Sequence, residues 1–500
     1  MDAPLQKLRS LFSLGRSADD LAEPQHLNDL LESLQSQPDQ VVLTVLLTQY
    51  IPTVITLSNL HMRFKQLEKA RGEMKRVLPR METMVSDAVL PLPAKAAEMA
   101  LLADNFLKNL ANAYASIVSS MSAHHQDAAL PHLMRSSIRR AMQILFRRQV
   151  LAYRAYASPS ASSWQQMHDL YRAARNRNMA GGTEEQTIER IYLSALLLDY
   201  CEPGKFPRPQ LEMLRDLVYT LSAMAAVVDA AQFERDNASL ASRFMVATDA
   251  GSAGEALSRT PENAPMFGNF IIECRAIVSA LDRRLASGEK PKSSHEAPES
   301  MLLAVRTALG GQVSRRFHRM RFKPKADLVA GFINAIDFIG GGPMSRRHDD
   351  PAEIEAISEW ALIDESPDSF GIRYQKGEKW PVQAGDLVVL RTREETRVHV
   401  CLVRRIANLE QQHLELGLQE LSPQAEVVTI ADTTGQPMNA ILLPRLPAFD
   451  GHVGLLVAPG TLALDTEIEV AAHPLASRWR PGKHAESNGQ VEFHVLDPVR

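Results

Sequence analysis

"AISEWALIDESPDSFGIRYQ", residues 356–375, decides the fold class of the second half of this chain. It holds two short runs of the kind that form β-strands, "AISEWALID" and "FGIRYQ". The residues between the two runs are rich in Asp and Ser, which favour turns at strand ends. The stretch therefore predicts two strands joined by a turn.

Similar runs recur from residue 326 onward and predict a small β-barrel. A tail over 436–500 continues the pattern, either as an extension of the barrel or as a second β module. The other runs are "ADLVAGFINAIDFI" (326–339), "GDLVVLRT" (385–392), "TRVHVCLVRRIA" (396–407), "HLELGLQEL" (413–421), "AEVVTIAD" (425–432), "AILLPRL" (440–446), "VGLLVAP" (453–459), "TEIEVAA" (466–472) and "VEFHVLD" (491–497).

Glycine usage separates this β-rich half from the rest of the chain. Residues 1–240 contain five glycines, whereas residues 301–500 contain sixteen. Helix interiors exclude glycine and turn-rich β structure uses it. The chain is thus predicted to be an α+β multidomain protein, in which an all-α bundle or solenoid precedes an antiparallel barrel.

Amphipathic helices dominate the first half. In "SSWQQMHDLYRAARNRNMAGG" (162–182), we expect Ser162 or Ser163 to cap a helix that Gly181 and Gly182 end, and the apolar residues share one face. "TEEQ" (183–186) has the spacing of a capping box before a helix over 188–200. A third helix is predicted to begin after Pro207 and Pro209 and to continue to Phe233.

The predicted domains follow from these patterns. Residues 1–285 form an all-helical interaction domain, and "ASGEKPKSSHEAPES" (286–300) has the composition of a flexible linker. Residues 301–435 form the barrel, and residues 436–500 form the β-rich extension.

Composition and motifs exclude several classes of protein. A net charge of −4 argues against wholesale nucleic-acid binding. Three well-separated cysteines, Cys201, Cys274 and Cys401, fit buried small residues in a cytoplasmic protein. The uncharged stretch 41–60 carries many polar residues and Pro52, so we expect a buried helix broken there and no membrane span. No motif for an enzyme active site, a cofactor or a metal is visible.

One segment concentrates positive charge. Six of the eleven residues from Arg315 to Lys325 are Lys or Arg, and none is acidic. Within it, Arg315 and Arg319 form an RxxxR pattern beside Arg316. Downstream, Asp364 and Ser366 form a D-x-S element on a predicted strand.

This pairing resembles the PilZ domain, the bacterial receptor module for cyclic di-GMP. In that family, RxxxR lies on a flexible loop and [DN]xSxxG lies on a neighbouring strand of a six-stranded barrel. The resemblance covers roughly residues 300–430. It implies a cyclic di-GMP site formed by Arg315, Arg316, Arg319, Asp364, Ser366, Ser369 and Gly371, with motility, pili or biofilm control as the output.

The chemistry of these side chains suits such a ligand. The planar guanidinium of arginine can bind phosphate with two hydrogen bonds, donate to guanine O6 and N7, and stack on the base. A short Asp or Ser on the strand can bind the N–H edge of guanine. A nearby glycine lets the ligand approach the backbone.

The sequence departs from the family pattern in two places. Ser369 stands where the motif has glycine, and Gly371 comes two positions later. The stretch 340–355 resembles an insertion, and its Arg346 and Arg347 offer a second basic pair. These departures leave open a degenerate PilZ-like scaffold that binds no nucleotide and acts as a protein adaptor. A nucleic-acid-binding barrel, with Phe317 and Phe322 stacking on bases, is a further alternative. The partner of the helical domain is predicted to be a protein.

Overall fold

The computed structural model describes most of the 500-residue chain, which divides into two compact units. The helical unit comprises Met1–Ala88, Ala94–Pro203 and Pro209–Ser314, and the barrel unit comprises Val89–Pro93, Gly204–Arg208 and Arg315–Arg500. The described residues are 24–123, 130–182, 186–233, 240–261, 266–288, 296–310, 324–341, 357–393, 397–409, 413–431, 436–444, 446, 452–462, 467–469, 478–487 and 489–499. Within them, no helix combines the length and the apolar character needed to cross a bilayer.

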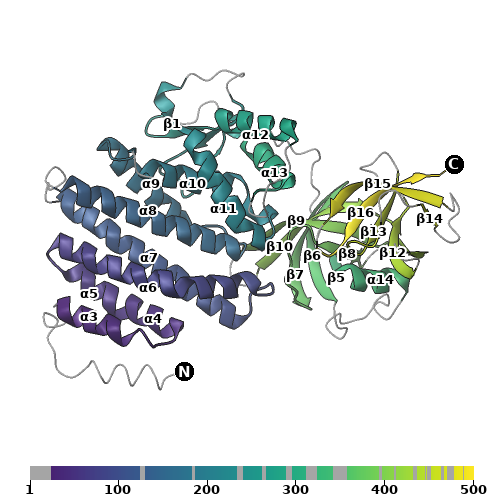
Figure 1. Ribbon diagram of the computed structural model, residues 1–500, viewed down its shortest axis with the longest axis horizontal. Coiled ribbons are helices and arrows are strands. Elements are labelled where there is room, and N and C mark those ends of the chain that lie inside the picture. The colour runs from purple at the N-terminus through teal and green to yellow at the C-terminus, as the bar shows by residue number, and fades with distance from the viewer. Residues whose placement is uncertain are drawn as a thin grey trace. The chain divides into compact units, whose positions relative to one another are not determined.

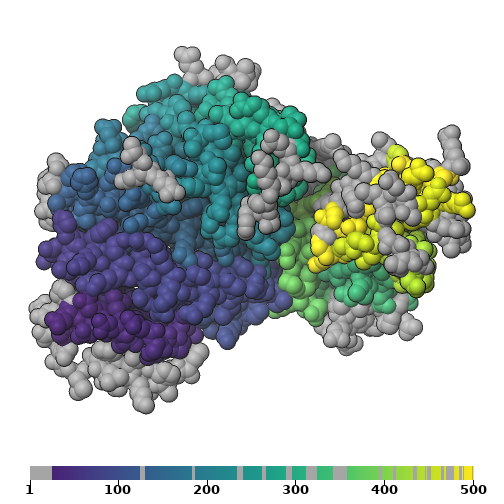
Figure 2. All heavy atoms as spheres, viewed as in Figure 1, coloured from purple at the N-terminus to yellow at the C-terminus, as the bar shows by residue number. Residues whose placement is uncertain are grey.

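Long helices that lie alongside one another form most of the helical unit (Figure 1). On the face shown in Figure 2, the N-terminal helices, coloured purple, form a continuous surface. The helices are α3 (Pro24–Ser33), α4 (Asp39–Val45), α5 (Ile51–Thr56), α6 (Leu60–Asp87), α7 (Ala94–Ala123), α8 (Pro131–Arg154), α9 (Ala161–Asn176), α10 (Ile188–Tyr200), α11 (Leu211–Leu221), α12 (Arg275–Ser287) and α13 (Glu299–Leu309).

The helix α7 explains how these helices pack. Its residues Phe106, Leu110, Tyr114, Ile117 and Met121 are each fully buried. They recur every three or four positions, so they form one apolar stripe along the helix. The helix contacts both α6 and α8, and its stripe contributes to the core of the unit.

The uncharged stretch 41–60 is helical as predicted, but Pro52 does not break it. A π-helical turn, Leu46–Tyr50, joins α4 to α5, and Pro52 occupies the first turn of α5. Proline lacks an N–H group and its ring clashes with the carbonyl four residues earlier. The wider π turn accommodates the ring there, so helical backbone continues from Asp39 to Thr56.

The helices α9 and α10 confirm the predicted elements but correct their caps. Ser160, rather than Ser162 or Ser163, caps α9 and accepts a hydrogen bond from the N–H of Ser163. The helix ends at Asn176, before the glycine pair. Thr187 caps α10 in the same way as Ser160 caps α9. Thr183 of the proposed capping box lies outside the described residues.

A four-stranded sheet that sequence analysis missed lies within the helical unit. The helix after Pro209 ends at Leu221, and a strand follows where a continuous helix was expected. Valines 227 and 228 favour a strand over a helix interior. The sheet has the order β1-β4-β2-β3, with β1 (Ala226–Asp229), β2 (Arg243–Val246), β3 (Glu255–Ala256) and β4 (Phe270–Glu273).

The barrel unit contains a closed six-stranded antiparallel barrel, as predicted. Its strand order is β10-β7-β6-β5-β8-β9, and β9 pairs with β10 to close it. The strands are β5 (Lys325–Ala330), β6 (Ser358–Ser366), β7 (Ser369–Gly377), β8 (Leu387–Thr392), β9 (His399–Leu409) and β10 (His413–Ser422).

Buried charges hold β5 between its two neighbours. Asp327 on β5 is 5% exposed and lies opposite both Glu359 on β6 and Arg391 on β8. The Arg391 guanidinium lies 3.5 Å from the Asp327 carboxylate. Arg393 donates to Glu359 at 2.6 Å, and Lys325 lies 2.8 Å from the other Glu359 oxygen. Each buried carboxylate therefore has a cation beside it.

Two predicted strands have a different place in the structure. "ADLVAGFINAIDFI" forms β5 and then the helix α14 (Phe332–Gly340), because Gly331 takes a positive φ of 85° and lets the chain change direction. "AEVVTIAD" forms β11 in a second sheet rather than in the barrel.

The tail forms a separate six-stranded sheet, one of the two alternatives that the sequence left open. The strand β15 was not predicted. The order is β11-β12-β13-β16-β15-β14, with β11 (Glu426–Ala431), β12 (Pro437–Leu443), β13 (Val453–Val457), β14 (Ile468–Glu469), β15 (Arg478–Ser487) and β16 (Glu492–Pro498).

This second sheet packs on the outside of the barrel. One apolar cluster joins Val389 and Leu402 of the barrel to Phe338 of α14 and to Ile441 and Phe493 of the tail. The outer side of β8 and of the first half of β9 is therefore covered.

Asp386, in the turn before β8, is a buried carboxyl group. It is 6% exposed, and one of its oxygens accepts a hydrogen bond of 2.7 Å from the N–H of Gln383. Burial raises the pKa of Asp386 to about 6, although the Gln383 N–H offsets part of the rise. The charged form thus destabilises the folded barrel.

We predict that Asp386→Asn stabilises the barrel unit above pH 6 and changes little below pH 4. The raised folded-state pKa means that wild-type stability is complete below about pH 4 and falls as pH rises through about 6, by at most about 3 kcal/mol. Asparagine keeps an acceptor for Gln383 without the charge. Thermal melting midpoints from pH 4 to pH 8 measure the difference. An equal loss of stability at every pH would contradict the prediction.

Candidate functional site

The β6–β7 hairpin carries the predicted strand residues of the site. In its register, Asp364 lies opposite Gly371 and Ser366 lies opposite Ser369. A bulge between Leu362 and Asp364 shifts the end of β6 by one residue. Directly opposed residues share a face of the sheet, so Asp364, Ser366, Ser369 and Gly371 lie on one face.

That face is the outer surface of the barrel. The alternate residues of β7, Phe370 and Ile372, are 4% and 0% exposed, and Phe370 packs against the His399 ring at 5.1 Å. Side chains alternate across a strand, so the neighbours of these two buried residues point the other way. The bulge in β6 keeps Asp364 on the outer face although Leu362 points inward.

Gly371, rather than position 369, is where an added side chain would clash with a neighbour. A Cβ atom at Gly371 would lie 2.3 Å from Oδ1 of Asp364, closer than any real contact. Ser369 has room for a side chain, and its hydroxyl lies 2.5 Å from that of Ser366. The Ser366 hydroxyl also donates to Asp368 at 2.9 Å. The two serines therefore close the hairpin end, while Gly371 lies under the Asp364 carboxylate.

A second glycine continues this surface on the next strand. Gly417 on β10 lies opposite Gly371, and Arg405 on β9 lies opposite Gly417. The row Asp364–Gly371–Gly417–Arg405 thus crosses four strands, with an acid at one end, a base at the other and no Cβ atom between them. We call this row the glycine shelf. Gly371 is buried under the Asp364 carboxylate, whereas Gly417 is partly exposed, so a planar ring can lie close to the backbone at Gly417.

Polar side chains border the glycine shelf on both sides. On one side, Arg373 and Glu415 form an ion pair with a shortest distance of 2.7 Å. On the other, Arg404 donates to Gln419 at 2.7 Å. Arg405 itself is exposed. The shelf therefore offers hydrogen-bonding groups around a flat centre.

The C-terminal end of the basic segment, Pro324 and Lys325, is hydrogen-bonded to backbone N–H groups beside the shelf. Pro324 accepts a hydrogen bond of 3.0 Å from the N–H of Leu362, two residues before Asp364. On the other side, Lys325 accepts from the N–H of Arg393 at 3.0 Å. The predicted ligand residues Arg315, Arg316 and Arg319, and the pair Arg346 and Arg347, lie outside the described residues.

Neither Gly417 nor Arg405 is among the ligand residues predicted from the sequence. The signal for Gly417 is a glycine inside the alternating run "HLELGLQEL", which often marks a close approach to the backbone. That Gly417 lies opposite Gly371 is visible only in the strand register. Arg404 and Arg405 are adjacent in sequence, and the bulge in β9 decides that Arg405 lies opposite Gly417.

Other chemistry has less support in the described part of the chain. No group of three His, Cys, Asp or Glu residues there could hold a metal ion. The three cysteines are free and buried, as predicted. Burial raises the pKa of each cysteine thiol well above its usual range, so these thiols are poor nucleophiles.

A closed barrel, a D-x-S hairpin end and an adjoining basic segment define a PilZ-type receptor domain. Two family models match this chain: "Cyclic-di-GMP receptor FimW, N-terminal domain" over residues 24–231 and "Cyclic-di-GMP receptor FimW, middle PilZ domain" over residues 343–426. Together they cover more than half of the chain, which belongs to this PilZ-containing family of cyclic-di-GMP receptors. No significant match was found among curated proteins or among solved structures. The arginines of the basic segment lie outside both matched ranges.

We predict that Gly371→Ala destabilises the barrel only while Asp364 is present. The new methyl group must displace the Asp364 carboxylate, which lowers the free energy of unfolding by about 1–2 kcal/mol. In an Asp364→Ala background, the same change should have little effect. Calorimetric melting of the four variants completes this double-mutant cycle. Equal losses in both backgrounds would show that Asp364 does not constrain Gly371.

Proposed function

We propose that this protein is a non-catalytic cyclic di-GMP receptor whose ligand lies on the glycine shelf under the basic segment. The hydrogen bond between Pro324 and Leu362 carries this proposal, because it fixes the end of the basic segment beside Asp364. Membership in a cyclic-di-GMP receptor family supports the choice of ligand.

Chain length keeps the arginines within reach of the shelf. Arg319 precedes Pro324 by five residues, and five residues span at most about 18 Å. Arg315 precedes it by nine residues, which span at most about 32 Å. Both distances allow the guanidinium groups to reach Asp364 and Gly417.

Each side chain then has a role that its chemistry suits. Arg315, Arg316 and Arg319 bind the phosphates and the O6 and N7 atoms of guanine. Asp364 accepts hydrogen bonds from the N–H edge of guanine, while Ser366 and Ser369 line the hairpin end. Gly371 leaves room for the Asp364 carboxylate, Gly417 lets the base lie near the backbone, and Arg405 adds a cation at the far end of the shelf.

The interaction energies are adequate for a signalling affinity. A hydrogen bond to a charged group contributes about 1.5–3 kcal/mol. Micromolar binding requires about 8 kcal/mol. Two or three arginine contacts, the Asp364 contact and stacking reach that value.

We further propose that ligand binding is coupled to the helical unit, which binds a protein partner. The basic segment adjoins the junction between the predicted domains, so a ligand bound by it would change the junction. The change is a population shift limited by the difference in ligand affinity between the two arrangements. The family resemblance suggests motility, pili or biofilm control as the output.

Calorimetric titration of cyclic di-GMP tests the site. We expect micromolar or tighter binding, with about ten- to a hundred-fold weaker binding in Arg315→Ala and Asp364→Ala. Arg405→Ala should weaken binding less, because it lies at the end of the shelf.

The matched control is Arg480→Ala. This exposed arginine lies on β15 of the second sheet, outside the barrel, and its loss should leave the affinity unchanged. Absence of binding heat together with an unshifted melting temperature would contradict the receptor proposal.

One observation favours an alternative function. The Ser366 hydroxyl is already engaged by Ser369 and Asp368, so the motif serine has less capacity for a ligand. If cyclic di-GMP does not bind, the barrel is a PilZ-like scaffold that presents a protein-binding surface. Binding of oligonucleotides with a steep salt dependence would instead support a nucleic-acid-binding barrel.

A further inference from the structure

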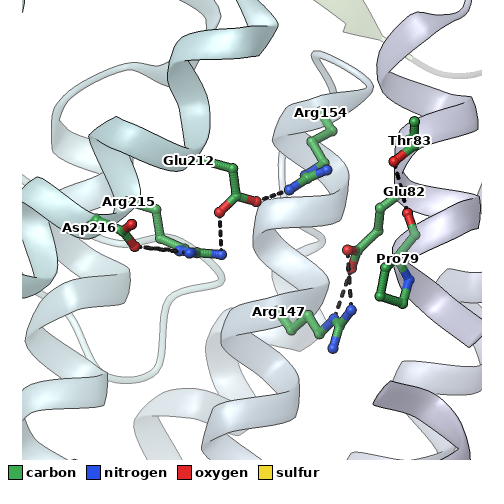
Figure 3. Close-up of polar contacts among 8 residues, drawn as sticks. All are labelled: Pro79, Glu82, Thr83, Arg147, Arg154, Glu212, Arg215 and Asp216. Atoms are coloured by element: carbon green, nitrogen blue, oxygen red, sulfur yellow. Dashed lines mark hydrogen bonds and ion pairs between the residues drawn. The ribbon is translucent and has the colours of Figure 1, made fainter. Parts of the chain in front are cut away.

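A charged cleft in the helical unit has no role in the proposed ligand site. It has a volume of about 580 Å³ and lies between α6, α8, α10 and α11. Figure 3 shows Arg147 and Arg154 on the central helix, α8, with Glu82 of α6 on one side and Glu212 and Arg215 of α11 on the other.

Arginines follow the α8 side of the cleft at a regular interval. Arg140, Arg147 and Arg154 all line it and are separated by seven residues each. Seven residues are close to two helical turns, so the three side chains lie on one face. The row is about 21 Å long, at a rise of 1.5 Å per residue.

Positive charge exceeds negative charge among the residues that line the cleft. Six cationic side chains face three carboxylates, which are Glu82, Glu212 and Asp216. The cations are Arg71, Lys75, Arg140, Arg147, Arg154 and Arg215. Glu68, which pairs with Arg71 and Arg140, adds a fourth acid and still leaves an excess of two cations.

Most of the arginines are held in place by ion pairs between helices. Arg147 binds Glu82 with hydrogen bonds of 2.8 and 3.1 Å. Glu212 contacts Arg154 through one oxygen and lies 2.5 Å from Arg215 through the other. These contacts preorganise the guanidinium groups, which reduces the entropy lost when they bind a partner.

Arg154 is the least exposed of the five arginines that line the cleft, at 14%. Burial and the neighbouring charges of Arg215 and Arg147 lower its pKa, and Glu82 opposes that shift. An added negative charge in the cleft would reduce the repulsion between these guanidinium groups.

Apolar side chains lie among the arginines. Ile144 and Val150 of α8, Met74 of α6 and Ile191 of α10 also line the cleft. Each of these four side chains is at most 7% exposed, so they form an apolar floor beneath the cations. The cations above this floor match a partner helix with carboxylates at the same spacing.

We propose that this cleft binds an acidic amphipathic helix of a partner protein, with carboxylates seven residues apart facing Arg140, Arg147 and Arg154. The inference rests on the proposed role of the helical unit in protein binding and identifies the chemistry of its partner. The length of the arginine row favours an extended partner over a small anion, which would contact one or two of the three.

A designed peptide probes the cleft of the full-length protein. A fluorescein-labelled helix of about 22 residues carries Glu at positions i, i+7 and i+14 with Leu between them, and a permuted peptide has the same composition without a common face. We expect the first peptide to bind with a dissociation constant of tens of micromolar at low salt. The permuted peptide should bind about tenfold more weakly, measured by fluorescence anisotropy.

Two variants locate the binding. Lys75→Glu reverses an exposed charge in the cleft and should weaken the first peptide about tenfold, and Arg215→Gln should weaken it less. The control is Lys65→Glu, an equal charge reversal at an exposed residue of the same helix that does not line the cleft. It should leave the affinity unchanged.

Two results would overturn the proposal. They are no peptide binding at low salt and equal binding of both peptides. Cyclic di-GMP titrations of the same variants separate the two hypotheses. If a variant loses peptide binding but keeps its nucleotide affinity, the result tests the cleft proposal alone. If the wild-type protein does not bind cyclic di-GMP, the result contradicts the barrel site and leaves the cleft proposal to the peptide measurements.

Discussion

The pairing of β5 with both β6 and β8 is the constraint on which the barrel site depends. Without it, the sheet has two open edges and the basic segment has no fixed end. With it, Pro324 is hydrogen-bonded to Leu362, and the basic segment ends beside the glycine shelf. Asp327, Glu359 and Arg391 make this pairing specific, because a register shift would leave buried charges without partners.

Much of the fold follows from local patterns in the sequence. Residues 188–200 are apolar at helical spacing and form α10, and alternating runs such as "HLELGLQEL" form strands. The failures have physical causes. The run 326–339 is mostly apolar, which suits a strand and a helix equally, and the φ of Gly331 decides where one becomes the other. The sheet inside the helical unit consists of strands of two to four residues, too short to show a period.

The candidate sites were predictable to different degrees. Asp364 and Ser366 stand out because their spacing matches a motif. Gly371 gains its meaning only from the residue across the hairpin, and Gly417 from the register between β7 and β10. The interval between Arg140, Arg147 and Arg154 can be read from the sequence, but the acids that hold them come from two other helices. Residue spacing in the sequence therefore predicts which side chains share a face of one helix or strand. Which residues of other elements lie beside them is known only from the strand register and the helix packing.

The second sheet has a practical consequence for protein engineering. The family match to the PilZ domain ends at residue 426, yet Val389 and Leu402 on the barrel are covered by Ile441 and Phe493, which come later in the chain. A fragment that stops at the end of the match would expose this apolar surface and tend to aggregate. A fluorescent reporter made from the barrel should therefore carry its C-terminal fluorophore after β16, where the covering sheet is complete.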